Sequence, residues 1–146
     1  AGDSYCDAPN VDRLSQLGSA TVSRVGEAAL PVPTEISVND LKNPQSAESY
    51  EGVLVTIRGP FQIARCEDPA QNCCVDEGYD RYGNLCVGLD SPTCGREPGP
   101  TSLEVTNEFY SIPEETTCIQ EITGVVVWFF SYRLSPRGPA DVVPCS

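Results

Sequence analysis

Histidine is absent from this chain of 146 residues, and lysine occurs once, at Lys42. Without histidine there is no side chain that ordinarily titrates near neutral pH, no Ser-His-Asp arrangement and no imidazole ligand for a metal. Adjacent acids such as Glu67 and Asp68 stand in loop-like sequence, where carboxylates are usually solvated, and no glycine-rich phosphate loop is present. We therefore expect a protein that is not an enzyme.

Basic residues are few: nine Lys and Arg stand against 21 Asp and Glu, which gives a formal net charge of −12. Affinity for nucleic acid depends on clusters of cations that contact phosphates. The arginines are spread along this chain, so we do not expect it to bind DNA or RNA at physiological salt. An acidic, self-repelling surface is the simpler interpretation, and a surface that attracts cationic partners is the alternative.

Long hydrophobic runs are also missing. The longest, residues 125–130, has the length of a strand, so no membrane span is expected. The chain starts AGDSYCDAP, which is typical of an end left after processing.

Eight cysteines are present, and no two have the Cys-x-x-Cys spacing that is common in zinc sites. An even number in a loop-rich chain predicts four disulfides and a secreted or cell-surface protein. Adjacent cysteines form a strained bond, so each of the neighbouring pair is expected to bond elsewhere. The sequence leaves the connectivity open, and a bond from Cys6 to Cys145 that ties the two ends is one candidate. The eight are Cys6, Cys66, Cys73, Cys74, Cys86, Cys94, Cys118 and Cys145.

Two segments, residues 50–65 and 122–143, are rich in β-branched and aromatic side chains and are bounded by turn residues. This composition predicts long strands of one sheet. Gly59 and Pro60 interrupt the first segment, where we expect a kink that lets one strand serve both halves of a small barrel.

The remaining pattern predicts shorter strands, and about five strands in total favour an all-β fold, a small OB-like Greek-key barrel stapled by disulfides. The predicted strands besides the first are residues 85–89, 103–110, 119–132 and 142–143.

The chain divides by composition into an N-terminal extension or arm, residues 1–35, and a barrel, residues 36–146, with a cysteine-rich insertion at residues 66–99. Within the extension, one short helix is expected between Asn10 and Gly18, and residues 21–29 read as a strand or an extended arm. A helical turn is expected at residues 37–41, before the break at Asn43 and Pro44.

A family resemblance rests on two stretches. SVNDLKNPQSAESYEGVLVTI, residues 37–57, resembles the opening of OB-like domains in secreted bacterial proteins, some of which sit beside extracellular endonuclease domains. ITGVVVWFFSYRLSPRGPADVV, residues 122–143, is similar to their closing strands. The resemblance implies an OB-like barrel in an accessory, non-catalytic role. The cysteine-rich middle departs from the plain strand and loop of that family.

Two candidate sites follow from the residues. Oxygen ligands between two cysteines could hold Ca²⁺, although their spacing is not that of an EF-hand and a solvated turn is the alternative; they are Asp76, Glu77, Asp80 and Asn84. No other cofactor is expected. Aromatic rings could form a stacking platform of the kind that OB-folds use for bases or sugars, with the core as the alternative. Alternation places Trp128, Phe130 and Tyr132 on one face and Phe129 on the other.

These observations predict a secreted, non-catalytic structural or interaction protein that self-assembles at the cell surface. The expected partner is a second copy of the chain or another surface protein. Residues 21–36 would leave their own barrel and pair with a strand edge of the next subunit, giving rings or open filaments. The apolar side chains that would fill pockets are Val22, Val25, Ala28 and Leu30. The alternatives are a monomer with the segment folded back and an OB-fold module that binds oligosaccharide or single-stranded nucleic acid.

Overall fold

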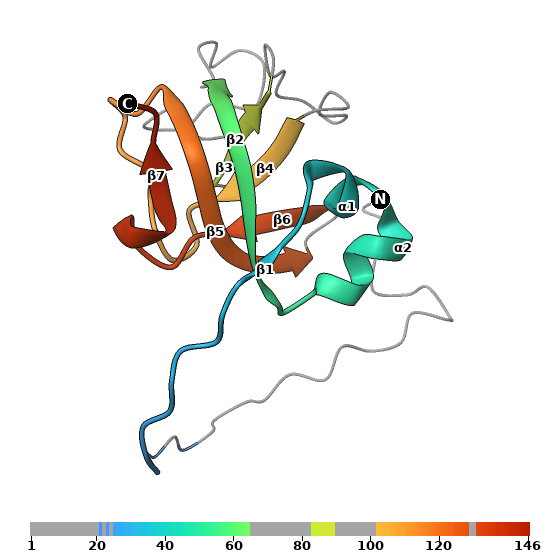
Figure 1. Cartoon of the computed structure of the whole chain (residues 1–146), viewed down its shortest axis with the longest axis vertical. Coiled ribbons are helices and arrows are strands. Elements are labelled where there is room, and N and C mark those ends of the chain that lie inside the picture. Colours follow the sequence, from blue (N-terminus) through green and yellow to red (C-terminus); the bar gives the residue numbers. More distant parts are fainter. Residues whose placement is uncertain (1–20, 22, 24, 65–82, 90–101, 129–130) are drawn as a thin grey trace, which may run out of the picture. The chain divides into compact units, whose positions relative to one another are not determined.

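The computed structural model describes residues 21, 23, 25–64, 83–89, 102–128 and 131–146. The chain forms two compact units, residues 1–30 and 31–146, and the helices and strands given below belong to the second (Figure 1). The helix expected between Asn10 and Gly18 and most of the cysteine-rich insertion lie outside the described residues.

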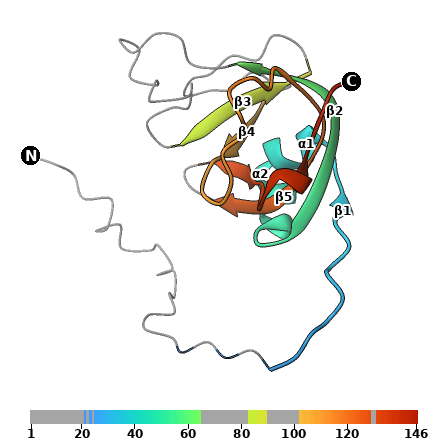
Figure 2. The ribbon, with the colours of Figure 1, turned by 90° about the vertical axis from the view of Figure 1, so that its left-hand side faces the viewer.

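Five strands close a barrel. They follow one another around the ring in the order β2 (Leu54–Ala64), β3 (Asn84–Gly88), β4 (Ser102–Thr106), β6 (Tyr132–Ser135) and β5 (Cys118–Trp128), and β5 pairs again with β2 (Figure 2). Neighbours are antiparallel except at β4 and β6, which are parallel. The fold is therefore the small OB-like Greek-key barrel that the sequence predicted.

The longest pairing, between β2 and β5, provides much of the core. The side chains that these two strands direct into the core are almost completely buried: Val55, Ile57, Phe61, Ile119, Ile122 and Val126. The register shifts between Arg58 and Phe61, and a Cβ on Gly59 would lie 2.5 Å from the Ile119 carbonyl oxygen. The kink predicted at Gly59 and Pro60 is confirmed, and it allows the end of β2 to reach β3.

The second β-rich segment is not one long strand, so the prediction of a strand over residues 119–132 is wrong. β5 ends at Trp128, the chain reverses, and β6 returns antiparallel with Trp128 opposite Tyr132. β7 (Val142–Pro144) then pairs with the first half of β5. β4 also ends at Thr106, four residues before the predicted end. No glycine or proline marks the turn after Trp128, so periodicity alone did not reveal it.

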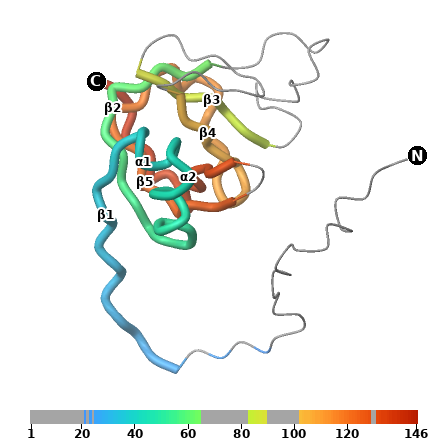
Figure 3. Tube along the Cα trace, turned by 90° about the vertical axis from the view of Figure 1, so that its right-hand side faces the viewer, coloured from blue at the N-terminus to red at the C-terminus, as the bar shows by residue number. Residues whose placement is uncertain are grey.

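The segment before the barrel covers one part of it. β1 (Thr34–Glu35) pairs in parallel with β2, and the chain continues through α1 (Val38–Lys42), α2 (Pro44–Ala47) and a 3-10 turn, η2 (Glu48–Tyr50), into β2 (Figure 3). Ser37 and Asp40 form a capping box at the start of α1, and Asn43 caps α2 by accepting from the Gln45 amide at 3.0 Å. The helical turn predicted here is confirmed, and α1 contacts β4 and β6.

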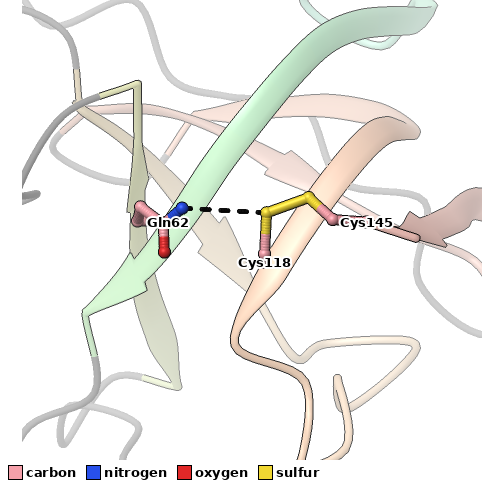
Figure 4. The surroundings of a disulfide bond; sticks show 3 residues. All are labelled: Gln62, Cys118 and Cys145. Carbon is pink, nitrogen blue, oxygen red and sulfur yellow. Dashed lines mark hydrogen bonds between the residues drawn. A yellow bond between two sulfur atoms is a disulfide. The ribbon is translucent and has the colours of Figure 1, made fainter.

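One disulfide closes the C-terminal end of the barrel. Cys145, just after β7, bonds to Cys118 at the start of β5, and the Cys145 amide donates to the Cys118 carbonyl at 3.1 Å (Figure 4). The suggested bond between Cys6 and Cys145 is therefore wrong, because β7 places Cys145 beside the strand that carries Cys118. Cys86 is also disulfide-bonded. Five cysteines lie outside the described residues: Cys6, Cys66, Cys73, Cys74 and Cys94.

An ion pair holds the chain between β6 and β7, around a 3-10 turn, η5 (Pro139–Asp141). The backbone amide and guanidinium of Arg137 donate to the Asp141 carboxylate at 2.8–2.9 Å. These hydrogen bonds lower the pKa of Asp141 below its ordinary value. A carboxyl with a lowered folded-state pKa stabilises the fold above its unfolded pKa, and this contribution is lost as the pH falls through the folded value.

The variant Asp141→Asn is expected to lose this contribution. At pH 7 its free energy of unfolding should be lower by about 1 kcal/mol, because the pair is partly exposed to water. Below about pH 4 the difference should begin to shrink, and it should vanish once the pH lies below the lowered pKa of the folded-state Asp141 carboxyl. Urea unfolding measured across this range is the test, and a difference that stays constant down to about pH 2 would contradict it.

Candidate functional site

The parallel junction between β4 and β6 is the least paired position of the barrel. Backbone register is limited to one pair, Val105 with Leu134, whereas β3 and β4 share five pairs. Side chains add the missing connection: Arg133 Nε lies 3.1 Å from Glu104 Oε2, and Ser131 Oγ donates to the same oxygen. The Arg133 and Glu104 side chains are only 8% and 14% exposed. A nearly buried ion pair thus joins two strands that have little backbone pairing.

A groove of about 310 Å³ lies beside this ion pair, and we call it the seam groove. Three parts of the chain form its walls: the junction of α1 and α2, the start of β4, and the turn between β5 and β6. Its lining residues are Leu41, Lys42, Pro44, Ser102, Leu103, Glu104, Trp128, Ser131 and Tyr132. Most of the walls are aliphatic or aromatic, with a few polar groups among them.

Two aromatic rings define one wall. Trp128 and Tyr132 face each other across the turn between β5 and β6, with ring centroids 4.8 Å apart and a tilt of 57°. Trp128 remains 49% exposed. The prediction that both rings share a face is correct, although they are cross-strand partners and not members of one strand. Phe129 and Phe130, as well as Tyr79 and Tyr82, lie outside the described residues.

The charges around the groove are mixed. Burial lowers the pKa of Lys42, and the nearby Glu104 carboxylate acts in the opposite direction. Burial raises the pKa of Tyr132, and the negative charges of Glu48 and Glu51 add to this effect. Acids therefore lie close to the aromatic wall. Apolar walls with a few polar groups are suited to binding.

Of the four residues predicted to hold Ca²⁺, the structure describes one. Asn84 begins β3 and is buried, at 3% exposed, while Asp76, Glu77 and Asp80 lie outside the described residues. Within the described ranges, no cluster of three or more acids or cysteines could hold a metal ion.

Of the predicted interaction residues, Val25, Ala28 and Leu30 lie on exposed chain, and Val22 is outside the described residues.

Sequence reasoning missed Lys42, Glu104, Ser131 and Arg133. A signal was present for two of them, because Glu104 and Arg133 each stand between apolar residues in a short strand. Opposite charges inside two apolar strands indicate a shared, paired environment. Lys42 carried no such signal, since it ends a short helix whose position depends on the fold of the whole chain.

Comparisons with protein-family models, with curated proteins and with solved structures found no match. No helix in the described part of the chain is long and apolar enough to cross a membrane.

Proposed function

We propose that this chain is a secreted, non-catalytic structural protein that self-assembles at the cell surface through residues 21–33, which we call the arm. The exposure of the arm's apolar side chains carries the proposal. Val25, Leu30 and Val32 are 98%, 81% and 90% exposed. Three apolar side chains uncovered within eight residues form a surface that a partner can bury.

The position of the arm supports a role as connector. It leads directly into β1, where Thr34 pairs with Val55 of β2, so one end is anchored to the barrel. The described arm residues form neither helix nor strand. A segment that is anchored at one end and exposed at its described residues up to Val32 can bind a second copy. Because donor and acceptor are then different surfaces, the contact is head-to-tail and repeats into rings or filaments.

The disulfides support secretion. The bond between Cys118 and Cys145, together with the bonded Cys86, fits an oxidising compartment. Such bonds would hold each subunit intact outside the cell, where no chaperone repairs it.

Removing residues 1–33 deletes the arm and is therefore expected to abolish assembly. The barrel should persist in the shortened chain, because its backbone pairing begins at Thr34. Size-exclusion chromatography with light scattering should find a monomer for residues 34–146 and larger species for the full chain. Circular dichroism of the truncated protein shows whether the barrel is retained. If the truncated protein keeps the oligomeric state of the full chain, the arm is not the connector.

A second candidate is an oligosaccharide-binding module. The observation that favours it is the half-exposed Trp128 at the seam groove, since aromatic faces bind sugar rings in OB-folds. Trp128 is the one tryptophan of the chain, so its fluorescence reports on the groove directly. Saturable changes on titration with oligosaccharides would favour this function over assembly.

A further inference from the structure

The seam groove and the arm have complementary chemistry. The groove, at about 310 Å³, is at the small end of the range of about 300–1,000 Å³ that is typical of ligand pockets. It accommodates a few side chains and not a large ligand. Its walls include Leu41, Pro44, Trp128 and Tyr132. The arm offers Leu30 and Val32 nearly fully exposed.

The sequence of the arm favours docking in a groove over pairing with a sheet edge. Residues 30–33 read Leu-Pro-Val-Pro. Each proline fixes its own backbone and restricts the residue before it to extended or polyproline conformations. Neither proline has an N–H to donate to a strand ladder. Stiff extended segments of this kind bind aromatic-lined grooves, since they lose little conformational entropy on binding.

The distribution of charge also favours binding of this segment in the groove. Each copy carries a formal charge of −12, so most of its surface repels a second copy. Residues 28–33 contain no charged side chain, whereas Glu27 stands just before them. This segment can therefore approach the acids Glu48 and Glu51 near Tyr132 without burying a like charge.

We propose that the seam groove of one copy binds residues 30–33 of a second copy, with Leu30 and Val32 packed against the Trp128 and Tyr132 rings. The inference rests on the proposed assembly and names its acceptor surface. A smaller cavity of about 220 Å³ next to β1 is a weaker acceptor, because it has no aromatic wall and its Arg58 is paired with Glu35 and Glu121.

Trp128→Ala in the full chain is expected to weaken assembly at least tenfold, roughly the loss for a buried aromatic anchor. Phe109→Ala is the matched control, because Phe109 is 59% exposed and is not part of the groove lining. Sedimentation velocity over a range of concentrations gives the association constants. The double variant Leu30→Asp/Val32→Asp alters only the arm and should weaken assembly as strongly, so a folding defect at Trp128 cannot explain both results.

The outcomes separate the two proposals. If Trp128→Ala assembles like the wild type while the truncated chain does not, the arm binds elsewhere and the groove assignment is wrong. If truncation has no effect, the proposed function itself fails. An excess of the peptide AALPVPTE should dissolve the assemblies of the full chain. In the Leu30→Asp/Val32→Asp variant, whose groove no second copy fills, the same peptide should shift the Trp128 fluorescence to shorter wavelength. An unchanged spectrum at saturating peptide, or a response to oligosaccharide instead, would overturn the inference.

Discussion

Replacing Arg133 with methionine is expected to lower the free energy of unfolding by about 3 kcal/mol, among the larger effects of any single substitution in this protein. Methionine retains apolar packing but leaves the Glu104 carboxylate without its guanidinium partner at 14% exposure. Ser131 still donates to this carboxylate, but a nearly buried charge without its ion-pair partner is costly. The substitution lies where β4 and β6 share only one register pair, so backbone pairing does little to hold the two strands together when the ion pair is lost.

Arg58→Met is the matched control for this prediction. Arg58 also pairs with carboxylates, Glu35 and Glu121, but its side chain is 60% exposed. Exposed pairs are screened by water and contribute little, so this variant should be close to the wild type in urea unfolding. Adding Glu104→Gln to Arg133→Met should restore part of the loss, because the buried charge is then removed. Equal stability of the two arginine variants would contradict the importance of the ion pair between Glu104 and Arg133.

The second large effect on stability is expected from removing the disulfide between Cys118 and Cys145. The two cysteines are 27 residues apart, and a loop of that length corresponds to about 3.5 kcal/mol of chain entropy in the unfolded state. β7 is only three residues long and its pairing with β5 is interrupted by a register shift. The disulfide is therefore a strong constraint on the C-terminal end of the barrel. Gln62 of β2 also contacts it there, with Nε2 lying 3.8 Å from Cys118 Sγ (Figure 4).

The double variant Cys118→Ser/Cys145→Ser leaves no unpaired thiol at this position. Its melting temperature should fall by roughly 10 °C relative to the wild type. Stability should fall most at the C-terminal end of the barrel, so the amides of Val142, Val143 and residue 145 should exchange with solvent much faster than those of β2. A melting temperature within about 2 °C of the wild type would show that β7 is held by its strand pairing alone.

Local signals in the sequence were sufficient for much of the fold. The β-branched and aromatic composition of residues 50–65 indicated β2, and Gly59 and Pro60 indicated its kink. The sequence of residues 37–41 indicated the helical turn of α1. Each of these features depends on residues near one another in the chain. The all-β barrel followed from the number and composition of the strands.

The features that sequence reasoning missed depend on contacts between distant residues. The turn after Trp128 contains aromatic residues and a serine, so nothing in its composition separated β5 from β6. The ion pair of Glu104 and Arg133 spans 29 positions and forms only when the barrel closes. The seam groove combines residues from the two short helices, from β4 and from the ends of β5 and β6, and it therefore had no contiguous pattern to detect.

Addition of residues 34–146 to the full chain tests the central claim most directly. Copies without the arm would retain the acceptor groove but could not extend the assembly, so each should terminate one end. Sedimentation velocity should show the mean size of the assemblies falling as the share of truncated protein rises, with truncated copies bound at the ends. Assemblies that keep their size and exclude the truncated protein at every ratio would contradict assembly through the arm.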